Sequence, residues 1–155
     1  MGFGRLRVAT FSVVCATAPA SAATQGVLFE ATVSPVCTLT VGDNGLMVAS
    51  PDLQTLSSKL GGGGAGHVGL ATTGGVEISV DPVTAVTVPP ADATATTWTP
   101  TYALSGSHSV AETGSATQLD DPGSSTVTVH LVGTKSGADS FAAGDYEATV
   151  TVRCE

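Results

Sequence analysis

Apolar and polar residues alternate with a period of two along most of this chain after residue 26. Because successive side chains of a β-strand point to opposite faces, this alternation predicts strands with one buried face. The clearest run is 76–80, in which Val76, Ile78 and Val80 alternate with polar residues. No stretch shows a 3.6-residue period over the length that a helix needs. The pattern therefore predicts an all-β fold.

The expected strands are short, and turns rich in glycine, proline, asparagine and aspartate separate them. They lie at residues 36–41, 68–71, 76–80, 84–88, 98–104, 127–131 and 146–154, with a broken edge strand or loop at 46–56 and turn-rich stretches at 105–114 and 120–124. Seven or eight such strands are typical of an immunoglobulin-like or Greek-key β-sandwich. Aromatic residues are only 5% of the chain, so we expect an aliphatic core with Trp98 as its largest single anchor.

The first 22 residues have the organisation of a Sec-type signal peptide. Arg5 and Arg7 precede a short apolar run at 8–18, and the small residues Ala20 and Ala22 suit a signal peptidase. The apolar run is too short for the ~20 residues that span a bilayer, so we expect no stable membrane insertion after cleavage. The domains expected are a signal peptide at 1–22, an N-terminal arm at 23–35 and a β-sandwich at 36–155. The mature protein is then periplasmic, surface-located or extracellular.

Cleavage would remove Cys15 and leave two cysteines, Cys37 and Cys154, in an oxidising compartment. Each shares the parity of the apolar residues of its own strand, so both sulfurs are expected to point inward. This predicts a disulfide between the first core strand and the last strand. In the chain-entropy model, closing a loop of about 100 residues contributes roughly 4.7 kcal/mol to stability.

The charge of the mature chain argues against several classes of partner. Cleavage leaves three basic residues, Lys59, Lys135 and Arg153, against 13 acidic residues, a formal charge of −10. Nucleic acids and anionic membranes attract basic surfaces, so neither is an expected partner.

Weak matches to catalytic and cofactor motifs favour structural explanations. Gly61, Gly63 and Gly66 have the spacing of a dinucleotide-binding loop, but they lead into a predicted strand rather than a helix. Ser107-His108 near Glu112 lacks the Gly-x-Ser-x-Gly elbow of a hydrolase. His67 and His130 are isolated in the sequence. We therefore expect no catalysis, no cofactor and no metal centre.

Two binding possibilities stay open. Asp120 and Asp121, with Asp43 and Asp139, offer oxygen ligands for Ca²⁺, although turn-forming aspartates explain them as well. Trp98 and Tyr102 would suit a carbohydrate platform if they were exposed, although two rings on one strand are typical of a core.

Residues 26–34, ahead of Pro35, form an alternating segment in front of the expected sandwich. Its apolar side carries four residues, Val27, Phe29, Ala31 and Val33. A free alternating strand of this kind is typical of a donor in intermolecular β-strand addition.

This layout resembles bacterial fimbrial subunits and their relatives in the spore coat protein U family. The matching features are the alternating segment 29–33, the cysteine that follows at Cys37, the small turn 143–146 and the terminal strand through Val150-Thr151-Val152. The resemblance implies an exported immunoglobulin-like subunit that a periplasmic chaperone delivers to an outer-membrane usher. It also implies polymerisation with identical subunits by donor-strand exchange.

One departure from that family leaves an alternative open. Typical fimbrial subunits carry the second cysteine soon after the first, whereas here it is Cys154. A bridge from the first strand to the last would close the groove that receives a donor, which favours a monomer with the arm folded into its own sandwich. The expected function is a structural or surface-assembly protein of fimbrial or coat type. The alternative is a monomeric periplasmic or extracellular binding module, for example for glycans, that uses loops near Trp98 or 61–66.

Overall fold

The computed structural model describes residues 21–155, so the predicted signal peptide lies almost wholly outside the described residues. Within residues 21–155 the fold is all-β and contains no helix, as predicted. The strands are β1 (Cys37–Val41), β2 (Val48–Ala49), β3 (Thr55–Ser57), β4 (Gly66–Thr72), β5 (Val76–Val80), β6 (Ala85–Thr87), β7 (Thr97–Gly106), β8 (Val110–Thr113), β9 (Thr117–Leu119), β10 (Gly123–Thr134), β11 (Glu147–Thr149) and β12 (Val152–Cys154). In this part of the chain there is no helix that could cross a membrane.

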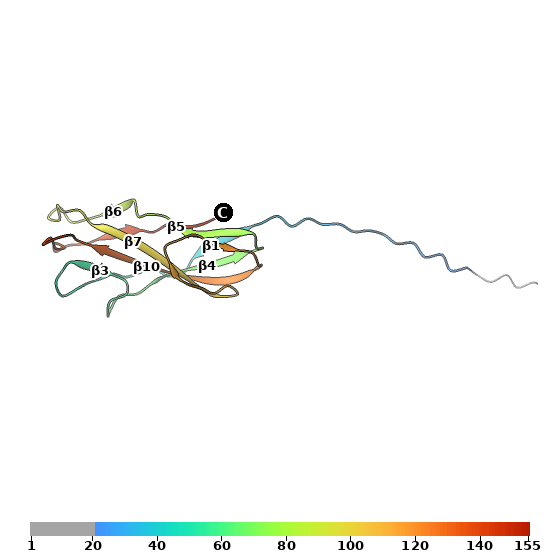
Figure 1. Ribbon diagram of the computed structural model, residues 1–155, viewed down its shortest axis with the longest axis horizontal. Coiled ribbons are helices and arrows are strands. Elements are labelled where there is room, and N and C mark those ends of the chain that lie inside the picture. Colours follow the sequence, from blue (N-terminus) through green and yellow to red (C-terminus); the bar gives the residue numbers. More distant parts are fainter. Residues whose placement is uncertain (1–20) are drawn as a thin grey trace, which may run out of the picture. The chain divides into compact units, whose positions relative to one another are not determined.

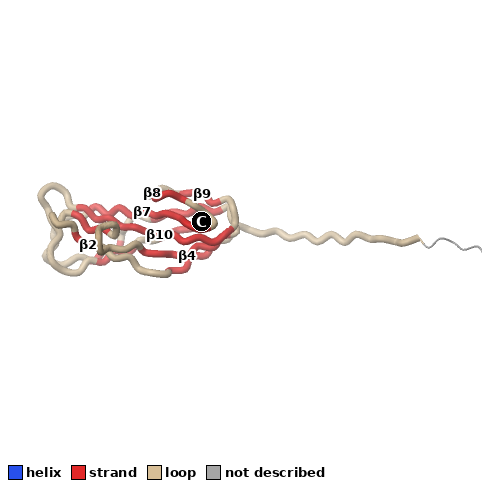
Figure 2. The backbone as a smooth tube through the Cα atoms, turned by 90° about the horizontal axis from the view of Figure 1, so that it is seen from below, coloured by secondary structure: helices blue, strands red, loops and turns tan. Residues whose placement is uncertain are grey.

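The strands form the two layers of a β-sandwich, and all pairings are antiparallel. In the large sheet β4 lies between β1 and β10, β7 pairs with the other edge of β10, and β3 continues where β4 ends. In the second layer β5 lies between β12 and β9. The segment after β5 contains β6, which pairs with β11 in the segment before β12. β7 and β10 are the longest strands, and loops gather at the ends of the sandwich (Figures 1 and 2).

Alternating burial explains why these segments are strands. In β5, Val76, Ile78 and Val80 are buried while Glu77 is exposed, because one face of the strand covers the large sheet. The inward residues of both layers form one core: Leu70, Val76, Ile78, Val80, Tyr102, Leu104, Leu119 and Val127.

Tyr102, rather than Trp98, is the largest fully buried side chain, so the prediction for Trp98 is wrong. The Tyr102 hydroxyl lies 3.0 Å from the Ile78 carbonyl and 2.8 Å from the Thr117 hydroxyl, which satisfies its polar end inside the core. Trp98 is only half-buried and lies over Gly133, where an added Cβ would come within 2.4 Å of the indole ring. The phenol at position 102 fits the core because it finds polar partners there.

The sandwich has twelve strands rather than seven or eight. The stretch predicted as turns at 105–114 contains β8, which forms a hairpin with β7 across a register shift. The segment predicted as one strand at 146–154 is divided into β11 and β12. β9 was missed, because three residues are too short to show a period. Short edge strands are fixed by their partners more than by their own pattern.

The alternating arm at 26–34 forms no strand in the structure, and its side chains are exposed. A strand needs a neighbouring edge to satisfy its backbone groups, and residues 21–36 have no such ladder. Phe29 is 88% exposed, and Val27 and Val33 are 73% and 77% exposed. The first tie to the sandwich is at Ser34, whose carbonyl accepts a hydrogen bond from the Thr73 hydroxyl at 3.1 Å.

Candidate strand-binding groove

The predicted disulfide is present and joins the start of β1 to the end of β12. The Cα atoms of Cys37 and Cys154 are 6.2 Å apart, and both residues are partly buried. The C-terminal end of the chain accordingly lies near β1 and β5 (Figure 1). The disulfide therefore fastens the edge of one sheet to the edge of the other.

Two unpaired strand edges face each other beyond this disulfide. β1 is an edge strand of the large sheet and pairs only with β4, and β12 is an edge strand that pairs only with β5. Likewise, β11 pairs only with β6. In the described residues no ladder connects β1 to β11 or β12. Each edge thus presents main-chain N–H and C=O groups that another strand would satisfy.

A groove of about 770 Å³ lies beside these edges, and Val41 at the end of β1 is the residue of that strand that lines it. β4, β10 and β3 supply its floor, and the chain from β1 to β2 forms one wall. The other wall is formed by residues 146–154, which contain β11 and β12 and are called the last strand region below. Its lining residues are Val41, Asp43, Asn44, Gly45, Leu46, Met47, Leu56, Ser58, Gly66, His67, Val68, Val129, His130, Leu131, Gly144, Asp145, Tyr146, Glu147, Ala148, Thr149, Val150 and Val152.

Exposure of apolar side chains rises from the core towards the groove. On the inner face of the large sheet Val127 is fully buried and Leu70 is 2% exposed, whereas Val41 is 72% exposed. Leu46, farther along the same wall, is 60% exposed. An apolar surface left uncovered inside a sandwich is typical of a binding site.

The disulfide limits how far a strand can enter this groove. A strand hydrogen-bonded on both edges keeps its neighbours about 9.6 Å apart, twice the usual spacing of about 4.8 Å. The 6.2 Å between the Cα atoms of Cys37 and Cys154 leaves no room for one. The groove is therefore closed at the disulfide end, but the bridge does not close its remaining length.

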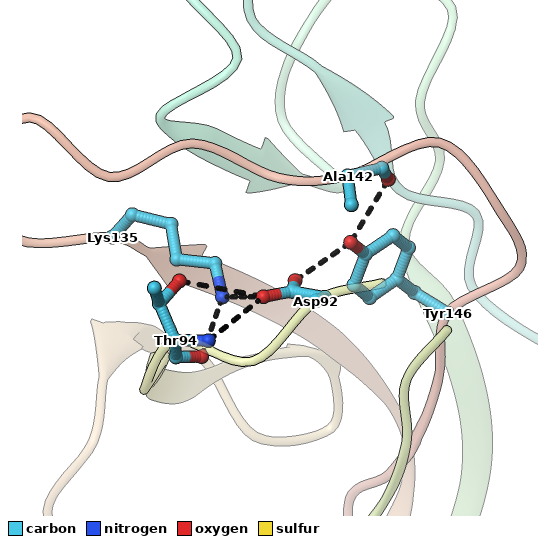
Figure 3. A network of polar contacts seen from close by, with 5 residues as sticks. All are labelled: Asp92, Thr94, Lys135, Ala142 and Tyr146. Carbon is cyan, nitrogen blue, oxygen red and sulfur yellow. Dashed lines mark hydrogen bonds and ion pairs between the residues drawn. The ribbon is translucent and has the colours of Figure 1, made fainter. Parts of the chain in front are cut away.

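A buried polar network positions the other end of the last strand region (Figure 3). The Lys135 ammonium donates to Asp92 Oδ1 at 2.6 Å and to the Thr94 carbonyl at 2.7 Å, and the side chains of the ion pair are almost completely buried. The Tyr146 hydroxyl lies 2.7 Å from Asp92 Oδ2 and 2.9 Å from the Ala142 carbonyl. Because Tyr146 also lines the groove, the network holds one wall of the groove in place.

The charges in this network perturb one another. Hydrogen bonds from Lys135 and then Tyr146 lower the pKa of Asp92. Burial, followed by the adjacent Asp92 carboxylate, raises the pKa of Tyr146 to about 12. Lys135 also lies 4.9 Å from the centre of the Phe141 ring, and that ring makes an edge contact with Tyr146. At neutral pH Asp92 is therefore a carboxylate and Tyr146 a neutral phenol.

The candidates Ser107, His108 and Glu112 have separate hydrogen-bond partners, and Ser107 Oγ accepts from the Ser124 amide at 3.2 Å. His108 Nδ1 lies 2.9 Å from the hydroxyl of Ser125, and its Nε2 lies 2.9 Å from the Asp121 carbonyl. Glu112 pairs instead with Lys59. His108 and Ser125 are both buried and connect β10 to the preceding loops. Their arrangement is that of a structural hydrogen-bond network.

The remaining candidate ligands are dispersed over the fold. Gly63 lies against the carbonyls of Ser57 and Ser58, within 2.9 Å of an added Cβ, so its loop packs on protein backbone. Among residues 21–155 no three histidine, cysteine or acidic side chains gather to hold a metal ion. Tyr102 is fully buried and Trp98 is half-buried, so the two rings do not form an exposed platform for a sugar.

Comparisons of the chain with family models, with curated proteins and with solved structures found no match. The groove and the polar network are the features that the sequence did not reveal. Asp92 lies 43 residues from Lys135 and 54 from Tyr146, so no local motif signals the network. The four inward residues of the last strand region were visible in the sequence, but the open space beside them was not.

Proposed function

We propose that this chain is an exported structural subunit of fimbrial or coat type, in which the arm of one copy fills the groove of the next. The observation that carries the proposal is that one chain contains both an acceptor groove for a strand and a segment that could be inserted as that strand. It has a partly apolar groove beside two unpaired edges and an exposed, alternating apolar arm. Adding the arm as a strand would satisfy both edges and cover the groove.

The two halves match in pattern and length. The last strand region turns four residues inward, namely Tyr146, Ala148, Val150 and Val152. The arm offers four apolar residues at the same spacing, Val27, Phe29, Ala31 and Val33. Six residue steps from the first to the last of either set span about 20 Å in an extended strand.

The disulfide favours one direction of insertion. The arm leads into its own domain at Cys37, so the backbone after Val33 must leave the acceptor groove and continue into a whole domain. The disulfide end of the groove is blocked, which leaves the open end for that exit. The arm would then run antiparallel to the last strand region, and repetition of this contact gives an open head-to-tail chain.

Burial of the arm supplies the driving force. Fully burying a Val or Phe side chain contributes roughly 1.5–3 kcal/mol, and the arm brings two valines and one phenylalanine that are more than 70% exposed. Ordering the arm costs roughly 1–2 kcal/mol per residue, which the new ladder and the buried side chains must offset. Insertion of the arm is therefore favourable only when its four apolar side chains fit into the groove.

A pair of adjacent substitutions tests the proposal. Phe29 and Leu28 are both highly exposed, but only Phe29 would face the groove. We expect chains from the protein beginning at residue 23, abolished by Phe29→Asp and retained by Leu28→Asp, because only the first buries a charge. Light scattering after size-exclusion chromatography measures the assembly.

Thermal unfolding of the two variants is the control, since neither side chain stabilises the sandwich. A protein that stays monomeric at high concentration, or equal loss of assembly in both variants, would contradict the proposal. The monomer result would favour a monomeric binding module.

A further inference from the structure

The groove carries an unbalanced negative charge. Asp43, Asp145 and Glu147 are among its lining residues, and within the described residues no lysine or arginine lines it. The three basic residues of this part of the chain are already paired with acids elsewhere. These ion pairs are Lys59 with Glu112, Lys135 with Asp92, and Arg153 with Asp81 and Glu155.

The arm brings a further negative charge to the same place. Glu30 is the only charged residue between positions 23 and 36. It lies at the midpoint of the four apolar arm residues, and Thr149 lies at the midpoint of the four inward residues of the last strand region. With the two sets in register, Glu30 therefore faces Thr149 whichever way the strand runs.

Alternation then decides which side Glu30 occupies. Because the apolar residues on either side point into the groove, Glu30 lies on the exposed side of the added strand, next to Thr149 and Glu147, which are exposed at the rim of the groove. Glu147 is the diagonal neighbour of this position, at about 7–8 Å. That distance is shorter than the screening length of about 10 Å at 0.1 M salt, so the two carboxylates repel each other.

We infer that the groove selects its strand by charge and prefers a strand from another protein with a lysine or arginine at the central outward position over the arm of its own chain. This inference rests on the proposed function of the groove. Glu30 is then a specificity-determining residue that weakens self-insertion at low ionic strength.

Peptide binding to an acceptor with a disabled arm tests this inference. The acceptor is the chain from residue 23 to 155 carrying Phe29→Asp, so that its own arm does not compete. The probes are labelled peptides of residues 24–34 with the natural sequence, with Glu30→Gln or with Glu30→Lys. Fluorescence anisotropy gives each dissociation constant at low salt and at about 0.5 M NaCl, where the screening length falls to a few ångströms.

At low salt we expect the Glu30→Lys peptide to bind about tenfold more tightly than the natural peptide, with Glu30→Gln between them. At high salt the three dissociation constants should converge within about twofold. In the acceptor, Glu147→Gln should reduce the difference between the peptides. Glu77→Gln is the matched control, because Glu77 is exposed on β5 and does not line the groove.

The outcomes separate this inference from the proposal beneath it. If no peptide binds at either salt concentration, the groove does not accept the arm and the proposed function is wrong. If all three bind with equal affinity at low salt, or if the natural peptide binds best, the groove accepts the arm but charge selection is wrong.

Discussion

The two ends of the last strand region are held in different ways. At the end marked by Cys154, a covalent bridge draws β12 to β1 and the second layer covers a fully buried core. At the end marked by Tyr146, a polar network holds the chain beside an open groove lined by exposed Val41 and Leu46. The closed end is fastened by the bridge and filled by the core, whereas the open end leaves apolar side chains exposed.

Breaking the closed end should have the largest effect. We expect replacement of Cys37 and Cys154 by alanine to lower the free energy of unfolding by up to about 4.7 kcal/mol, because the bridge restricts a long loop in the unfolded chain. Urea unfolding followed by circular dichroism measures the change.

The native protein unfolded in the presence of reductant should match this double variant. A loss below about 1 kcal/mol in both would show that the closed end is held by packing rather than by the bridge.

Breaking the network at the open end should have the second largest effect. Lys135→Met leaves the buried Asp92 carboxylate without its ammonium partner, and we expect a loss of about 3 kcal/mol in unfolding free energy. The replacement keeps an unbranched side chain of similar length beside Phe141, where the Lys135 ammonium lies in the native protein. Equal stability of Lys135→Met and the native protein would mean that water reaches Asp92 and replaces the ammonium.

The same network predicts a pH dependence with a defined sign. The pKa of Asp92 is lower in the folded protein, so ionised Asp92 stabilises the fold at pH values above its unfolded pKa of about 3.9. That stability is lost as the pH falls through the lowered folded pKa. Asp92→Asn should show a smaller loss between about pH 4 and pH 2 than the native protein does, measured by urea unfolding across this range.

Truncation of two matched valines, one in the core and one at the groove, should give the smallest difference in stability. Val127 and Val68 lie opposite each other on β10 and β4, but Val127 is fully buried and Val68 is only half-buried towards the groove. We expect Val127→Ala to cost about 2 kcal/mol and Val68→Ala less than about 1 kcal/mol. Chemical denaturation of the monomer provides both values.

Occupying the groove should reduce that difference. With a bound arm peptide Val68 becomes covered, and the cost of Val68→Ala should rise towards that of Val127→Ala. If Val68→Ala costs as much as Val127→Ala in the unoccupied monomer, the difference in burial between the core and the groove would have no effect on stability, and this prediction would be wrong.

The sequence by itself determined the all-β class and the Cys37–Cys154 pair. Alternation reports directly which residues share a face, and only two cysteines remained once Cys15 was assigned to the signal peptide. The inward parity of Val150 and Val152 was equally visible. These features depend on neighbours in the chain, which a sequence displays.

Tertiary structure decided what lies beside each face. Only the packing of the second layer places Tyr102 in the core, with hydrogen-bond partners, and leaves Trp98 half-buried. Only the folded chain joins Asp92, Lys135 and Tyr146 from separate segments. The groove likewise depends on which edges find partners, because an alternating strand has the same pattern whether its edges are paired or free.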